Sequence, residues 1–394
     1  MLSLRAAAHT VSLDLPAPDP ESLAHSARVV EFVGEYIDRA GGSLPFDQYM
    51  EIVLHQPGVG YYASGTHKLG AGGDFITAPE LGNLFGRCLA HQVAEVLHQF
   101  GGGSVLEVGP GTGALAVALL QELTALDELP DRYFLLETSP ELTARQQKTL
   151  APRLGDYQSR VHWLNQLPTN FSGVVLVNEM LDALPVTRFR VESGKALEAY
   201  VQTGEQGFDW CWQGAAPNSP STAIIEQHCL PEGYSSECAP RAAAWVRAVA
   251  ESLQQGLLLI IDYGYSAAEY YHPDRITGTL MCHYRHRAHS NPFHLPGLQD
   301  ITAHVDFSAL ATAGRSAGLE LAGFSNQEAF LLALGVTDLA EVGCDTEARA
   351  RISQEVQQLV FPSGMGERFK VLALAKGIEG PLKGFTLRDR STQL

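Results

Sequence analysis

The chain has 394 residues, of which 27 are basic and 44 acidic, so its formal net charge at pH 7 is −17. This charge disfavours nonspecific binding to nucleic acid or to anionic membrane surfaces, and it suits a basic substrate or partner. With 45% hydrophobic residues and no apolar run of membrane-spanning length, the sequence predicts a globular protein of one large domain with additions, or of two domains.

Six cysteines are scattered along the chain without a C-x-x-C pair. Such a distribution is typical of reduced thiols and gives no zinc framework. The first residues include one arginine and no long apolar segment, so a secretory signal is not expected. We therefore expect a cytoplasmic protein. The mitochondrial matrix is the alternative if the chain is eukaryotic and a transit peptide lies upstream.

The first hundred residues are expected to be helical apart from one glycine-rich stretch. Apolar residues recur at helical spacing over 25–40, and a second helix is expected at about 45–55. The stretch 58–79 is too irregular for a helix or a strand, and a loop of this length in a compact domain is usually functional or disordered. A helix follows near 81–99, so we expect residues 1–103 to form an N-terminal helical region.

Strands and helices alternate from residue 104 onward. We expect strands near 104–109, 132–137, 159–164, 173–178 and 257–263, with helices near 112–126, 140–150 and 240–254. This order predicts an α/β fold with a largely parallel sheet and right-handed crossovers.

Two stretches interrupt the alternation. Alternating apolar residues over 186–235 predict an inserted β-meander, whereas 264–306 is expected to be a long irregular loop at the active site. The remaining predicted elements are helices at about 307–317, 326–335 and 345–359, and strands at 319–324 and 368–375. The core is thus expected to span 104–377, followed by a C-terminal tail at 378–394.

A glycine-rich turn, Glu107–Gly113, follows the first of these strands and leads into an apolar helix. Glycines allow a backbone to approach a ligand closely, and the helix N–H groups point at that ligand. Gly109, Gly111 and Ala114 also satisfy the dinucleotide pattern G-x-G-x-x-G/A, which leaves NAD open. However, Glu107 would repel a phosphate and attract an ammonium group. Together with Gly113, it favours S-adenosylmethionine.

Polar residues follow the next two strands. Glu137 ends the second strand, where a carboxylate can bind both ribose hydroxyls, a feature shared with NAD enzymes. After the third strand, Asn165 and Gln166 could hydrogen-bond the adenine edge. A loop amide more often caps a turn, and we favour that second interpretation for this pair.

The fourth strand ends in the segment Asn178–Pro185, which contains two acids. Ligands of open parallel sheets lie beyond the carboxyl ends of the strands, so Asn178, Glu179 and Asp182 are expected beside the transferring methyl group. Two carboxylates there could bind a guanidinium. The alternative for Asp182 is that it caps the following turn.

The sequence resembles the MidA-like family of class I methyltransferases. The matching segments are Pro57–Tyr62, Gly73–Glu80, Glu107–Gly113, Asn178–Pro185, Asp262–Tyr265 and Pro292–Phe307. The resemblance implies a Rossmann-like methyltransferase sheet, with the N-terminal helical region and the β-rich insertion as additions. It also implies S-adenosylmethionine as the cofactor, protein-arginine methylation as the family activity, and a protein substrate with an arginine acceptor as the partner.

With this resemblance, further residues gain expected roles. The segment containing Asp74 is expected to fold over the cofactor and exclude water. Tyr61 and Tyr62 are expected either to form an aromatic wall for a cationic side chain or to pack in the core. His304 and Asp306 are expected to orient or deprotonate the acceptor, with a structural role for His304 as the alternative.

Four histidines, His283, His286, His289 and His294, lie close together in the sequence. Their spacing matches no zinc signature, so we expect no metal site. Two other functions stay open from the sequence. One is an NAD-dependent oxidoreductase, and the other is a non-catalytic S-adenosylmethionine-binding assembly factor for a respiratory or other complex. The oligomeric state is not predicted.

Overall fold

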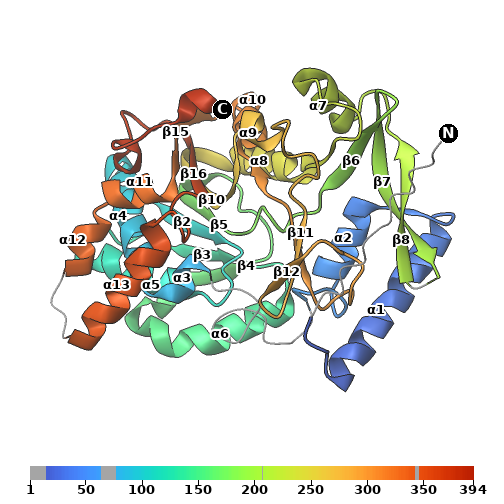
Figure 1. The fold of residues 1–394 in the computed structure, drawn as a ribbon. Coiled ribbons are helices and arrows are strands. Elements are labelled where there is room, and N and C mark those ends of the chain that lie inside the picture. The colour runs from blue at the N-terminus through green and yellow to red at the C-terminus, as the bar shows by residue number, and fades with distance from the viewer. Residues whose placement is uncertain (1–14, 64–76, 206, 342–345) are drawn as a thin grey trace.

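The computed structural model describes residues 15–63, 77–205, 207–341 and 346–394. Its centre is a sheet with the strand order β15-β16-β10-β5-β2-β3-β4, and β14 pairs with β10 beside this path (Figure 1). The strands of the path are β2 (Ser104–Val108), β3 (Tyr133–Leu136), β4 (Val161–Leu164), β5 (Phe171–Asn178), β10 (Leu253–Tyr265), β15 (Glu320–Asn326) and β16 (Phe369–Lys376).

The strands from β4 to β10 all pair in parallel, which confirms the predicted parallel sheet. The last strand, β16, differs because it runs antiparallel to both of its neighbours, β10 and β15. It therefore completes the sheet from the C-terminal end of the chain.

Helices cover both faces of the central sheet. On β5, Val174 and Leu176 pack into one apolar core, and Val175 and Val177 pack into the other. Burying one such side chain stabilises the fold by about 1.5–3 kcal/mol. The first face is covered by α4 (Leu84–Phe100), α5 (Ala114–Ala125), α6 (Pro140–Leu154), α11 (Gln327–Ala333), α12 (Val336–Glu341) and α13 (Thr346–Val360). The second face is covered by α8 (Pro240–Ser252) and α10 (Phe307–Ser316).

Side-chain caps fix where two of the helices begin. The first helix, α1 (Pro20–Arg39), begins before the predicted residue 25, because the Asp19 side chain accepts the N–H of Ser22 and Pro20 suits the first turn. In the same way, Ser139 accepts the N–H of Leu142 at the start of α6. This cap lies just after the carboxyl end of β3, so the residues that join β3 to α6 are at that edge of the sheet.

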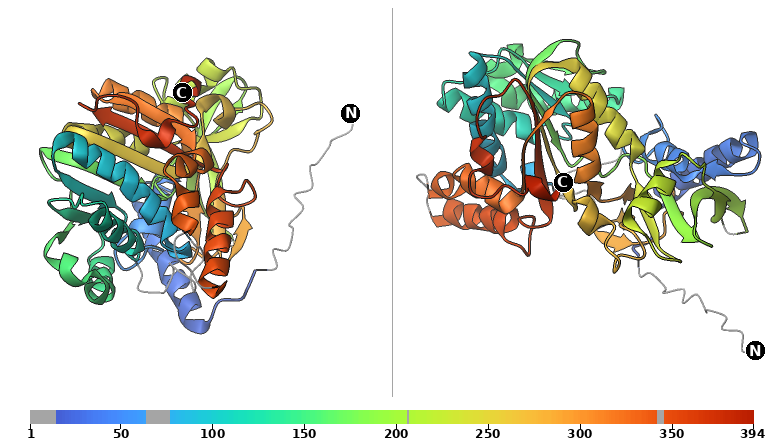
Figure 2. Two further views of the ribbon diagram at one scale, coloured as in Figure 1. Left: turned by 90° about the vertical axis from the view of Figure 1, so that its left-hand side faces the viewer. Right: turned by 90° about the horizontal axis from the view of Figure 1, so that it is seen from above.

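The N-terminal helices α1 and α2 (Phe46–His55) pack against the insertion. Strand β1 (Leu44–Pro45) pairs with β7, and Phe46 contacts Trp210 with ring centroids 4.8 Å apart. Figure 2 shows the two units together beside the central sheet. The inserted strands are β6 (Thr187–Glu192), β7 (Lys195–Gly204), β8 (Gly207–Gly214) and β9 (Ser235–Cys238). The predicted β-rich insertion is confirmed, although helix α7 (Pro220–His228) was not expected.

The stretch 264–306 is less irregular than predicted. It contains α9 (Ala267–Tyr270), β11 (Met281–Tyr284), β12 (Arg287–His289), β13 (Asp300–Thr302) and β14 (Val305–Asp306). Arg285 and His286 join β11 to β12 and have φ angles of +47° and +62°. This is the two-residue hairpin turn that usually carries Asn-Gly. With Arg-His in its place, and with such short strands, the sequence gives no hairpin signal.

The C-terminal segment packs against the core. Leu382 and Phe385 are buried, and a Cβ built at Gly323 on β15 would lie 2.3 Å from the Phe385 ring. The remaining short elements are α3 (Ala78–Leu81) and the 3₁₀ turns η1 (Gly155–Ser159), η2 (Lys383–Phe385) and η3 (Ser391–Gln393). Over the described ranges, no helix combines the length and apolar character needed to cross a bilayer. The domain boundaries stay a prediction.

Candidate cofactor and acceptor site

A cavity of about 370 Å³ lies at the carboxyl ends of β2, β3 and β5. Its described lining comes from the residues that follow these three strands and from the N-terminal region. Ligands of open α/β sheets bind at this edge, and the volume is within the range of small-molecule sites. Of the candidate residues from the sequence, the cavity brings together Glu107, Gly109, Gly111, Glu137, Asn178 and Glu179.

The glycine turn forms one wall of the cavity. Gly109, Gly111 and Gly113 have φ angles of +65°, +54° and +79°, a region that side chains disfavour. Gly109 and Gly111 line the cavity. Gly113 is not among the lining residues, and a Cβ there would lie 2.3 Å from a methyl carbon of Leu150 on α6. Gly113 thus allows α5 and α6 to approach closely. A contact with the cofactor stays a prediction.

Glu107 lies at the base of the cavity, where it is 4% exposed. The Tyr133 hydroxyl donates a hydrogen bond of 2.6 Å to Glu107 Oε2. Burial raises the pKa of Glu107 to about 8, although this hydrogen bond acts in the opposite direction. A ligand ammonium group beside this carboxyl would favour its ionised form.

Glu137 also lines the cavity, and both of its carboxylate oxygens are held by the protein. Oε1 accepts the N–H of Ser139 at 2.9 Å, and Oε2 accepts the side-chain amide of Gln146 at 3.1 Å. Burial raises the pKa of Glu137. Asn165 and Gln166 are solvent-exposed and are not among the lining residues, so their contact with adenine stays a prediction.

Glu179 lines the cavity directly after β5, with a φ angle of +50° that is uncommon outside glycine. Its Oε1 accepts the Ala78 N–H and the Asn178 amide, each at 3.1 Å. Desolvation raises the pKa of Glu179 to about 7. Asn178 also lines the cavity, and its Oδ1 is buried without a hydrogen-bond partner among the described residues.

Asp182 and Asp262 interact electrostatically with Glu179 but are not among the residues that line the cavity, so the expected place of Asp182 at the acceptor stays a prediction. The Tyr263 hydroxyl donates to Asp182 Oδ2, whereas Asp182 Oδ1 has no hydrogen-bond partner in the described part of the chain. Asp262 accepts the backbone N–H groups of Leu181, Asp182 and Tyr263, and it thereby holds the turn after β5. Burial raises the pKa of Asp182 to about 6, and burial and repulsion by the other two acids raise that of Asp262 further. The three carboxyls therefore disfavour simultaneous ionisation.

His304 and Asp306 are not among the residues that line the cavity. Asp306 Oδ1 accepts the N–H of Ala309 and caps α10. The His304 ring stacks on Tyr265, with centroids 5.1 Å apart, and contacts Tyr263 edge-on. Burial lowers the pKa of His304 to about 4, so the ring is neutral at pH 7. The expected roles of both residues at the acceptor stay predictions.

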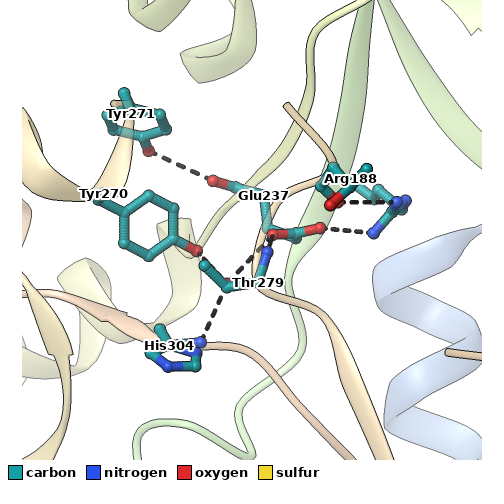
Figure 3. Close-up of polar contacts among 7 residues, drawn as sticks. Arg188, Glu237, Tyr270, Tyr271, Thr279 and His304 are labelled. Carbon is teal, nitrogen blue, oxygen red and sulfur yellow. Dashed lines mark hydrogen bonds and ion pairs between the residues drawn. The ribbon is translucent and has the colours of Figure 1, made fainter. Parts of the chain in front are cut away.

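Figure 3 shows the polar network to which His304 belongs. Its backbone N–H donates to Thr279 Oγ1 at 3.1 Å, and the backbone N–H of Thr279 donates to the buried carboxylate of Glu237 at 2.7 Å. Arg188 on β6 pairs with the same carboxylate at 2.5 Å. The network ties the insertion to the segment that carries His304.

The N-terminal region closes one side of the cavity. Tyr62 lines it and donates its hydroxyl to Asp300 Oδ1 at 2.9 Å, whereas Tyr61 is buried in the core. Glu80 also lines the cavity and accepts the hydroxyl of Thr112 in the glycine turn. Asp74 lies outside the described residues, so its expected place over the cofactor stays a prediction.

Comparison with known proteins identifies the family of the chain. Residues 88–325 match the model of a family described as "Putative S-adenosyl-L-methionine-dependent methyltransferase". The chain belongs to this family. It is also 43% identical to a Burkholderia thailandensis protein whose crystal structure contains S-adenosyl-homocysteine. That match covers 96% of this chain and 100% of the other, with a TM-score of 0.93.

Two curated relatives carry a more specific name. The chain is 28% identical over 395 residues to the "Protein arginine methyltransferase NDUFAF7 homolog, mitochondrial" of Caenorhabditis elegans, with 90% of each chain covered. It is 29% identical to the Danio rerio "Protein arginine methyltransferase NDUFAF7, mitochondrial", with 85% of this chain and 84% of the relative covered. These matches span most of the chain, as the sequence resemblance implied.

Family membership selects S-adenosylmethionine over NAD, the choice that the glycine turn left open, and confirms the predicted family, fold class and cofactor. The cavity fits this cofactor. Glu107 offers a carboxyl to an ammonium group, Gly109 and Gly111 expose their backbone, and Glu137 presents a carboxylate at the next strand end. Gln146, which donates to Glu137, was not singled out from the sequence, because a lone glutamine inside a helix gives no functional signal.

Proposed function

We propose that this protein transfers the methyl group of S-adenosylmethionine to an arginine side chain of a protein substrate. The observation that carries the proposal is Asn178 Oδ1, a hydrogen-bond acceptor of a cavity-lining residue that is buried without a partner among the described residues. The ionisable carboxyl of Glu179 lines the cavity beside it. The C. elegans and D. rerio relatives, which are named protein arginine methyltransferases, support the same acceptor.

Arginine fits this end of the cavity for a chemical reason. Buried polar groups that remain unpaired cost free energy, so unfilled acceptors favour a ligand rich in N–H donors. A guanidinium has five N–H donors, has no acceptor and stays charged in proteins. Its charge would also stabilise the ionised forms of Glu179 and Asp182, whose pKa values are raised in the free protein. A neutral hydroxyl has one O–H donor, so it could fill one acceptor, but it has no charge to stabilise the ionised acids.

Different residues of the cavity would have different roles in this reaction. Glu107, Gly109, Gly111 and Glu137 would hold the cofactor, which supplies a methyl group already activated by a sulfonium. Glu179 would bind and orient the guanidinium, so that alignment accounts for much of the catalysis. Glu179, the ionisable carboxyl that lines the cavity, would also accept the proton that the methylated nitrogen releases. The segment Thr77–Glu80 would help to exclude water.

The test compares methylarginines with and without the protein. Extract from cells that lack the protein is incubated with purified enzyme and isotope-labelled S-adenosylmethionine, and labelled peptides are identified by mass spectrometry. We expect label on arginine with the wild type, and far less with Glu179→Gln. Label on another residue type would refute the arginine acceptor. Absence of all label from a protein that binds S-adenosylhomocysteine would instead favour the non-catalytic assembly factor.

A further inference from the structure

Gln146 on α6 is 1% exposed, and its side-chain amide makes hydrogen bonds to three different segments beside the cavity. Nε2 donates to the carbonyl oxygen of Gly111 at 3.0 Å and to Glu137 Oε2 at 3.1 Å, while Oε1 accepts the indole N–H of Trp163 at 3.0 Å. One side chain thus joins the glycine turn after β2, the carboxylate after β3, and strand β4.

The chemistry of the partners fixes the orientation of this amide. An indole N–H can only donate, so Trp163 must face the amide oxygen. The carbonyl of Gly111 can only accept, so it must face the NH₂ group, as must an ionised Glu137. All three contacts are satisfied in one orientation and would be lost in the flipped one. Gln146 is therefore a fixed donor beside Glu137.

We infer that Gln146 is a positioning residue that sets the carboxylate of Glu137 for the ribose hydroxyls of the cofactor. Ser139 and Gln146 each hold one oxygen of Glu137, so the carboxylate is fixed at both ends. A carboxylate oxygen has more than one acceptor direction, which leaves capacity for a diol. The same amide fixes the Gly111 carbonyl, so the turn and the carboxylate keep one spacing. This inference rests on the proposed ribose contact of Glu137.

The first experiment compares two probes by calorimetric titration, S-adenosylhomocysteine and its 2′-deoxyribose analogue. The wild type should prefer the hydroxylated ligand by about tenfold, as expected for a hydrogen bond to a charged group. In Gln146→Leu this preference should fall to about twofold or less. Equal loss of affinity for both probes would overturn the inference, because it would indicate general damage to the cavity.

The second experiment uses charge and does not depend on the leucine variant. Gln146→Glu keeps the shape and can still accept from Trp163, but its carboxylate cannot donate to Glu137 and repels it. Its affinity for S-adenosylhomocysteine, relative to wild type at the same pH, should be about tenfold lower at pH 8. It should recover at pH 5.5, because a protonated carboxyl again offers a donor. A ratio that does not change with pH would overturn the inference.

Two controls separate the possible failures. Gln147→Glu adds the same charge at the exposed neighbouring residue and should stay within about twofold of wild type at both pH values. Glu137→Gln tests the underlying assignment. If it leaves the preference for the ribose hydroxyl intact, the proposed cofactor contact fails. If it removes the preference while Gln146→Leu retains it, only the role of Gln146 fails. Failure of both Gln146 variants to fold would also contradict a positioning role.

Discussion

Replacing Glu179 by glutamine should separate the chemistry of the site from the stability of the fold. The two oxygens of the carboxylate become one oxygen and one NH₂ group of nearly equal size. The new amide oxygen can still accept the N–H groups of Ala78 and Asn178, which Glu179 Oε1 accepts at 3.1 Å. The φ angle of +50° is tolerated equally by either residue. We therefore expect the variant to fold and to bind S-adenosylhomocysteine.

The effect on stability follows from the pKa of Glu179. Desolvation raises it from 4.5 to about 7, so ionising this carboxyl opposes folding above pH 4.5. This shift corresponds to about 3 kcal/mol at pH 8. Glutamine avoids the cost. In the absence of ligands, Glu179→Gln should therefore be more stable than wild type at pH 8 and nearly equal to it at pH 4.5.

The same substitution that raises stability at pH 8 should lower the rate of methyl transfer. A neutral amide cannot pair with a guanidinium as a carboxylate does, and losing one such contact in the transition state costs about 3 kcal/mol, or about a hundredfold in rate. Denaturant unfolding at the two pH values, and turnover of the arginine substrate at saturating cofactor, measure the two effects. A variant that is less stable at pH 8, or whose turnover stays within a few-fold of wild type, would refute the reasoning.

Three further predictions concern the cofactor end of the cavity. Gly111→Val should fold with lowered stability, because valine is strained at φ +54°, and it should lose S-adenosylhomocysteine binding in a calorimetric titration, because Gly111 lines the cavity; normal affinity in the folded variant would contradict the assignment. Gly113→Ala should lower the melting temperature by several degrees, the effect of about 1–3 kcal/mol, through its contact with Leu150 and its φ of +79°, and Leu150→Ala should cost less stability in this variant than in the wild type; if Gly113→Ala instead keeps its stability and loses affinity, Gly113 contacts the cofactor. Affinity should rise from pH 6 to pH 8 by up to about tenfold per unit, because an ammonium group pairs with ionised Glu107, whose pKa in the free protein is about 8. Tyr133→Phe should move this rise to higher pH, and Glu107→Gln should abolish it; a wild-type profile without this rise would refute the role of Glu107.

The sheet could be predicted because its signals are local. Buried parallel strands such as β5 are continuous apolar runs, and the polar residues that follow them must lie at one edge. Glu107, Glu137 and Glu179 were found in this way, and the structure places all three on one cavity.

The elements and contacts that were missed depend on tertiary structure. The hairpin at Arg285 and His286 has the backbone of a tight turn without its usual residues, so the surrounding packing must determine it. Gly113 belongs to the motif, but only the approach of Leu150 shows what a side chain there would displace. The hydrogen bonds of Gln146 become apparent only when α6 is packed beside the residues that follow β2 and β3 and beside β4.

The position of β16 has a consequence for how the chain is made on the ribosome. Residues 369–376 lie between β10 and β15, so both of those strands keep an unpaired edge until β16, which follows them in the chain, has been synthesised. Exposed edges pair readily with other chains, and incomplete sheets are prone to aggregate. A nascent chain that stalls before residue 369 would therefore need a chaperone to shield β10.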